Sequence, residues 1–170
     1  MFDPLHPALV HVPLGLALVM PLVAGGLALA IRKGSLPRRA WLVAAALQAV
    51  VVAGGGAAFW AGHREEHRVE GVIAEQLVER HEDRAEAFLW SAAAALALAL
   101  GVLAVPERRA PATAAVMAAG AVVVAALGVW TGKAGGELVY RHGAARAYTG
   151  EEETAQAPRL EARGGHRHRD

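Results

Sequence analysis

Four long apolar stretches divide the chain, and the charged residues are confined to the segments between and beyond them. The stretches cover about residues 8–31, 40–61, 86–105 and 112–132, and none carries a charge in its interior. A helix crosses the hydrocarbon core of a bilayer with about 20 apolar residues. Because lipid offers no hydrogen-bond partner, a spanning segment satisfies its own backbone by forming a helix. The pattern predicts an all-α integral membrane four-helix bundle of up-down-up-down topology, with residues 1–147 as the transmembrane domain.

The two longer polar segments have different patterns. Residues 62–85 are rich in charge, but Val69, Ile73 and Leu77 recur with roughly helical spacing. We expect this extramembrane segment either to extend the second and third spans as helix or to lie on the membrane surface as an amphipathic helix. Residues 148–170 contain few bulky apolar side chains, which predicts a disordered polar tail.

Basic residues gather in the two short loops that lie on one side of the predicted bundle. The loop 32–39 holds four basic residues and no acid, and the loop 106–111 holds two basic residues and one acid. The positive-inside rule places these loops in the cytoplasm. The expected topology is therefore N-out/C-out in a plasma membrane.

The four tryptophans support the boundaries of the spans. Trp60, Trp90 and Trp130 fall at the outer ends of spans, and Trp41 falls at an inner end. Tryptophan is enriched at both membrane–water interfaces, where its amphipathic ring suits the headgroup region. We expect all four side chains to form an aromatic belt.

The composition excludes several kinds of site. The chain has no cysteine, so it has no disulfide, no thiolate zinc site, no iron–sulfur cluster and no covalent CxxCH haem. No basic patch with interleaved aromatic residues indicates a nucleic-acid partner. The lipid bilayer is the expected partner, and non-covalent haem and imidazole or carboxylate metal sites stay open.

Histidine has the most informative distribution. The six histidines that precede the tail all fall at one end of the predicted bundle: His6, His11, His63, His67, His81 and His142. Imidazole is costly to place near hydrocarbon, and it is the commonest ligand of metals in proteins. The pattern predicts a histidine cluster at the outer end of the bundle, with three possible roles.

The first hypothesis is a b-type haem used in electron transfer with a redox partner, since four helices can hold haem iron between histidines of different helices. The candidate ligands are His6, His11, His81 and His142. Glu137 and Arg141 are spaced to pair on a helix, and with Glu82 they are expected to orient the ligating rings.

The second hypothesis is a zinc, copper or iron site built from the same histidines with Glu82 or Glu137. The third is a structural or assembly subunit without a cofactor, in which the histidines cap helices and the chain contacts another membrane protein or forms a homo-oligomer. No catalytic residue is assigned under any of the three, and the pattern does not decide whether the protein is an enzyme.

The segment His63-Arg64-Glu65-Glu66-His67 fits the HxxEH signature of inverted zinc proteases. His63 and His67 would share a helix face, as metal ligands do. A five-residue match arises easily by chance in a segment so rich in Glu, Arg and His. We therefore expect at most a contribution of these two histidines to a neighbouring metal site.

Two segments of the chain resemble a known family. Residues 6–15 read HPALVHVPLG and residues 135–143 read GGELVYRHG, and a looser LxxHE-like match surrounds His81. These resemble the HPxxVHxPxG and GGELVYRHG signatures of a bacterial four-span membrane protein family that is classed as a domain of unknown function. The resemblance spans about residues 4–147 and implies a four-helix fold in a bacterial membrane, without a settled activity. The residues that match its motifs are His6, His11, His81, Glu137, Arg141 and His142.

Overall fold

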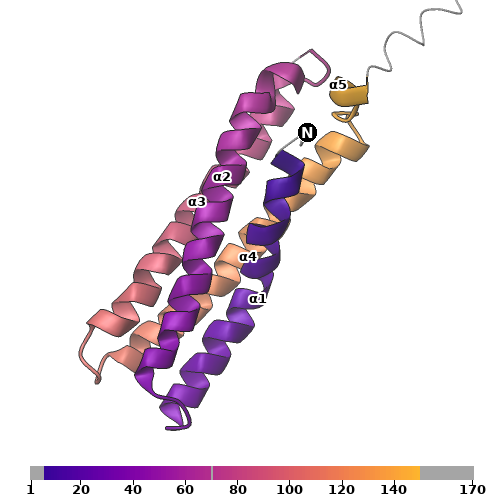
Figure 1. Cartoon of the computed structure of the whole chain (residues 1–170). Coiled ribbons are helices and arrows are strands. Elements are labelled where there is room, and N and C mark those ends of the chain that lie inside the picture. Colours follow the sequence, from indigo (N-terminus) through magenta and orange to yellow (C-terminus); the bar gives the residue numbers. More distant parts are fainter. Residues whose placement is uncertain (1–5, 70, 150–170) are drawn as a thin grey trace, which may run out of the picture.

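Four long helices form the molecule in the computed structural model, which describes residues 6–69 and 71–149 (Figure 1). They are α1 (His6–Arg32), α2 (Trp41–Val69), α3 (Glu75–Ala104) and α4 (Ala110–Tyr140). A short 3₁₀ helix η1 (Arg38–Ala40) precedes α2, and α5 (Arg146–Thr149) follows α4. All four long helices are long and apolar enough to cross a membrane. The prediction of an all-α four-helix bundle is confirmed.

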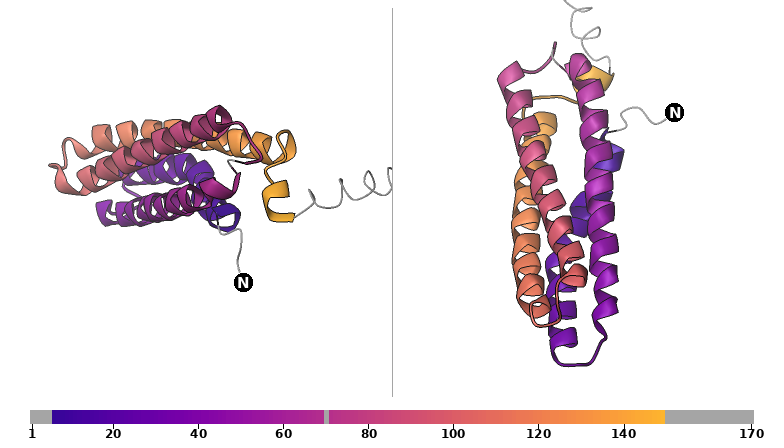
Figure 2. Two further views of the ribbon diagram at one scale, coloured as in Figure 1. Left: turned by 90° about the horizontal axis from the view of Figure 1, so that it is seen from above. Right: turned by 90° about the vertical axis from the view of Figure 1, so that its left-hand side faces the viewer.

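The helices run alternately up and down and close into a ring (Figures 1 and 2). Each packs against its neighbours in the chain, and α4 packs against α1. One end of the bundle, here called the histidine end, holds the starts of α1 and α3 and the ends of α2 and α4. The other, here called the basic end, holds the α1–α2 and α3–α4 connections. The six histidines thus share one end, as the alternating topology requires.

Small side chains fill the interior and larger apolar side chains cover the outside. Most of the buried hydrophobic residues are alanines, whereas Leu22, Val12 and Val129 are more than half exposed. This is the reverse of a water-soluble core, because lipid is as apolar as leucine and helices gain most in a membrane by close backbone approach. The buried Pro13 illustrates that approach: its ring lies 3.4 Å from the position that a β-carbon on Gly54 would take.

Much of residues 62–85 extends α2 and α3 as helix, which is the first of the two arrangements expected from the sequence. Helix α2 continues to Val69, a turn follows, and α3 begins at Glu75, so both helices extend beyond their apolar stretches. The predicted disordered tail, residues 148–170, lies outside the described residues apart from Tyr148 and Thr149, which end α5.

Three of the four tryptophans point outward, as an aromatic belt requires, and the prediction is wrong for the fourth. Trp60, Trp90 and Trp130 are 58%, 69% and 49% exposed on the outer surface. Trp41 is fully buried. It is the first residue of α2 and lies on the same inward stripe as Ala44, Ala45 and Gln48, which are also buried. Helical periodicity, rather than position at a span end, decides the direction of this side chain.

The guanidinium group of Arg38 links two segments of the chain at the basic end. Arg38 Nε donates to the carbonyl of Val102 at 3.0 Å, and Arg38 Nη2 donates to the carbonyls of Val102 and Val105. These carbonyls belong to the last turn of α3 and its cap, where backbone acceptors lack helical donors. Arg38 therefore joins the α1–α2 connection to the end of α3.

A buried side-chain amide links α2 to α3 in the middle of the bundle. Its removal tests how much this link contributes to the free energy of unfolding. Gln48 Nε2 donates to the carbonyl of Ala92 at 2.9 Å, while Gln48 Oε1 has no partner within the described structure. Interhelical hydrogen bonds in membranes average about 0.6 kcal/mol, and a buried acceptor without a donor costs about 1–3 kcal/mol. We expect Gln48→Leu to keep or raise the free energy of unfolding in detergent.

The matched comparison is Gln48→Ala, which removes the same bond and leaves a cavity. That variant is expected to lose about 2 kcal/mol or more. A clear loss of stability in Gln48→Leu would show that the amide contributes more than its single bond indicates.

Candidate metal site

The charged end of α2 directs consecutive side chains to different neighbours. His63 and Glu66 are three residues apart, so they share a helix face. The ring of His63 approaches the carboxylate of Glu66 and, across the gap to α3, the carboxylate of Glu82. Glu65 faces elsewhere: its carboxylate accepts from the backbone N–H of His6 at 3.2 Å and from the hydroxyl of Tyr148 at 3.0 Å. Glu65 therefore ties the start of α1 and α5 to α2, while its neighbours form a separate group.

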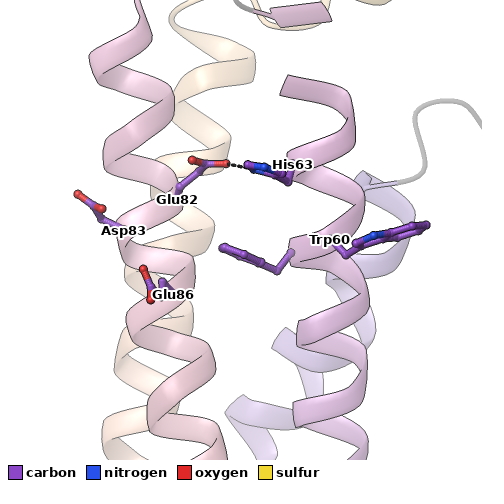
Figure 3. A pocket seen from close by; sticks show the side chains of 6 residues that line it. Trp60, His63, Glu82, Asp83 and Glu86 are labelled. Atoms are coloured by element: carbon purple, nitrogen blue, oxygen red, sulfur yellow. Dashed lines mark hydrogen bonds and ion pairs between the residues drawn. The ribbon is translucent and has the colours of Figure 1, made fainter. Parts of the chain in front are cut away.

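That separate group has the composition and spacing of a metal site. His63 Nδ1 lies 3.3 Å from Glu66 Oε2 and 3.4 Å from Glu82 Oε1. The three potential ligand atoms all lie within 4.8 Å of one another. Figure 3 shows the Glu82 carboxylate facing the His63 ring across the space between the two helices. For bonds of about 2.0–2.2 Å at a tetrahedral angle, ligand atoms lie roughly 3.4 Å apart. The two shorter distances match that value.

The surroundings of the group are acidic and open to solvent. A pocket of about 280 Å³ adjoins it, lined by Phe59, Trp60, His63, Glu82, Asp83 and Glu86. The side chain of His63 is 69% exposed, and those of Glu66 and Glu82 are 22% and 31% exposed. Glu86 accepts a hydrogen bond from Trp90 Nε1 at 3.1 Å, and Asp83, on the same helix, also lines the pocket. The carboxylates attract a cation, and the exposure leaves room for water to complete its coordination.

His6 and His81 form a second, more enclosed pair. Their ring centroids lie 6.1 Å apart with an interplanar angle of 89°. His6 Nδ1 donates to the carbonyl of Ala58 at 2.7 Å, which leaves Nε2 as the nitrogen with the lone pair. His81 Nδ1 is buried and has no partner in the described part of the chain. This pair packs α1, α2 and α3 together at the histidine end.

Two glycines make the room for these rings. A β-carbon on Gly62 would lie 2.9 Å from His6 Nδ1, and one on Gly135 would lie 3.1 Å from His81 Cε1. Gly135 belongs to the GGELVYRHG segment, so part of that motif serves the packing of His81 against α4.

Of the four haem candidates, the structure brings His6 and His81 together, but it does not bring His81 together with His11 and His142. His81 faces the interior, whereas His11 and His142 are exposed, and the described residues show no contact among the three. His11 lies five residues after His6 on a continuous helix, so the two side chains point in different directions. His142 follows the end of α4 and precedes Gly143, whose φ of +75° is the left-handed conformation common just after a helix.

The remaining predicted residues have identifiable surroundings. Glu137 Oε1 lies 4.0 Å from both Lys133 Nζ and Arg141 Nη1, so the predicted pairing of Glu137 with Arg141 is present at the edge of contact. His67 is exposed, one turn beyond His63, and does not belong to the group of three. Glu82, expected to orient a ligating ring or to act as a carboxylate ligand, faces His63 directly.

The sequence pattern does not identify Glu66 as a candidate ligand. Glu66 belongs to the HxxEH match, but that match points to the two histidines four residues apart. The signal that identifies it is its spacing of three residues from His63, on the face that meets α3.

These observations define the class of the molecule as a helical membrane protein whose four spans carry a histidine and two glutamates grouped at one end. Comparison with protein-family models, with curated proteins and with solved structures gives no match for this chain. The family resemblance of residues 6–15 and 135–143 therefore stays a prediction from sequence.

Proposed function

We propose that this membrane protein binds a divalent transition-metal ion, zinc above all, through His63, Glu66 and Glu82 at the histidine end. The observation that carries the proposal is the spacing of the three ligand atoms, with His63 Nδ1 at 3.3 and 3.4 Å from the two carboxylate oxygens. Two of these residues come from α2 and one from α3, so the helix packing itself brings the ligands together.

The donor set favours zinc. One imidazole nitrogen and two carboxylate oxygens suit a borderline cation, and zinc sites with three protein ligands keep a fourth position for water. Copper(I) prefers thiolate and thioether sulfur, and the chain has no cysteine. Copper(II) and iron(II) accept the same nitrogen and oxygen atoms, so they are the competing ions for this site.

The exposure of His63 to solvent indicates whether a metal ion would be held permanently or reversibly at this site. A structural zinc ion is enclosed by four protein ligands, whereas His63 is 69% exposed and the group offers three. An ion held here exchanges with solvent. We infer reversible metal capture at the membrane surface, with the acidic pocket beside it raising the local cation concentration.

Haem binding remains the alternative predicted from the histidine pattern. Axial ligation needs two imidazoles that face one gap wide enough for a porphyrin. Within the described residues, the rings of His6 and His81 approach each other, whereas the other two candidates, His11 and His142, are exposed. A small ion has the better support, because His63, Glu66 and Glu82 already place three ligand atoms within 4.8 Å of one another.

The test is metal binding by the detergent-purified full chain, measured by calorimetry with zinc and by the visible spectrum of bound cobalt. We expect one ion per chain, and Glu82→Gln is expected to weaken zinc binding by at least about tenfold, because even outer-shell changes cost 10–100-fold. Glu86→Gln is the matched control: it removes a carboxylate from the same pocket but outside the group of three.

Equal losses in the two variants would show general attraction of cations to an acidic surface. The absence of zinc binding in folded protein would show that His63 and the two glutamates form only a surface ion-pair cluster. Either result overturns the proposal.

A further inference from the structure

The basic end contains a second pocket, about 340 Å³ in volume, between α1, the start of α2 and the α3–α4 connection. Apolar side chains form much of its wall, among them Ile31, Val102 and Ala114. Two arginines and one glutamate also line it. It is at the opposite end of the bundle from the candidate metal site and takes no part in that site.

One residue of the pocket wall, Trp41, carries a buried donor without an acceptor. Trp41 lines it and is 0% exposed, and its indole Nε1 has no hydrogen-bond partner among the residues described. An indole N–H usually finds an acceptor when it is buried, and a buried polar group left unpaired costs about 1–3 kcal/mol. An occupant with an acceptor oxygen would remove this cost.

Positive charge surrounds the same pocket. Arg32 and Arg38 line it, opposed by Glu107. Arg38 is held in place by the carbonyls of Val102 and Val105, so its charge is fixed at the pocket wall. The α1–α2 and α3–α4 connections together contain six basic residues and one acidic residue. The electrostatic environment therefore favours an anion.

We propose that this pocket binds the phosphate headgroup of an anionic phospholipid, with Trp41 and Arg32 contacting the phosphate region. A phosphate oxygen would accept from the indole N–H and lie near the guanidinium charges. The apolar side chains of the wall would suit an acyl chain, whereas a soluble anion would gain nothing from them. Basic pockets between membrane helices are known to hold acidic headgroups. This proposal does not depend on metal binding at the other end.

The test offers the detergent-purified full chain equal amounts of phosphatidylglycerol and phosphatidylcholine with identical acyl chains, and measures retained lipid by native mass spectrometry. We expect retention of phosphatidylglycerol. Trp41→Phe removes the N–H and keeps an aromatic ring, and Arg32→Gln removes a charge from an exposed side chain. Each is expected to lower retention roughly tenfold, the value of one hydrogen bond to a charged group.

Two further variants control for general charge effects. Arg39→Gln removes an equal charge from the same loop at a residue that does not line the pocket, and it should retain the lipid as the unmodified chain does. Glu107→Gln removes the opposing carboxylate and should raise retention. Equal losses in Arg39→Gln and Arg32→Gln, or equal retention of the two lipids, would overturn the proposal. Displacement of the lipid by millimolar inorganic phosphate would assign the pocket to a soluble anion instead.

Discussion

Saturating zinc is expected to raise the free energy of unfolding of the protein, and His63→Ala is expected to abolish that gain. An ion that binds only the folded state stabilises it by mass action, by about 2.7 kcal/mol at a free concentration one hundred times Kd. His63 supplies the nitrogen that lies within 3.4 Å of both carboxylates, so its loss removes the centre of the group. The measurement is thermal unfolding in detergent with and without zinc.

His67→Ala is the control for this experiment. His67 lies one turn further along α2, outside the group of three, so that variant should keep the full stabilisation by zinc. If His67→Ala loses the gain and Glu66→Gln keeps it, the ion is bound by the HxxEH histidines and the grouping of His63 with Glu66 and Glu82 is wrong.

Gly62→Ala is expected to cost about 1–3 kcal/mol of folding free energy, the usual penalty for overfilling a packed site. The new β-carbon would lie 2.9 Å from His6 Nδ1, closer than any real contact of this type. The ring cannot simply yield, because the same nitrogen is bonded to the carbonyl of Ala58 at 2.7 Å. The substitution must break that bond or move the start of α1.

Gly56→Ala is the matched control, on the same helix and 6 residues earlier. Nothing lies within 4 Å of a β-carbon at that position, so alanine should gain up to about 1 kcal/mol from its better helix propensity. Both free energies are measured by denaturant titration in detergent. Equal effects of the two substitutions would show that His6 is not held tightly between α1 and α2.

The bundle was predictable because lipid leaves few structural choices. Charge-free stretches of membrane length fix the number of helices, and short connections fix their alternation. The direction of an individual side chain is a finer question. Trp41 was assigned to the membrane interface from its place at a span end, but the register of α2 turns it inward with Ala44 and Gln48.

The candidate site was predictable to the level of one end of the bundle. Alternation places the six histidines together, but it does not show which of them converge. The contact between His63 and Glu82 depends on how far α2 and α3 extend beyond the membrane and on how they are rotated about their axes. The ring of His81 points toward Gly135 although the next residue, Glu82, points toward α2. Such divergence of adjacent residues arises from packing and has no signature in spacing alone.

The hydrogen bonds of Arg38 make the two ends of the bundle different in how their helices are joined. At the basic end, one guanidinium fastens the α1–α2 connection to the end of α3. At the opposite end, α2 and α3 continue beyond their apolar stretches, and His63 and Glu82 meet between exposed surfaces. The two ends of the α2–α3 pair are therefore joined by different kinds of contact. An ion held by His63 and Glu82 would join the two helices at the end of the bundle that Arg38 does not reach.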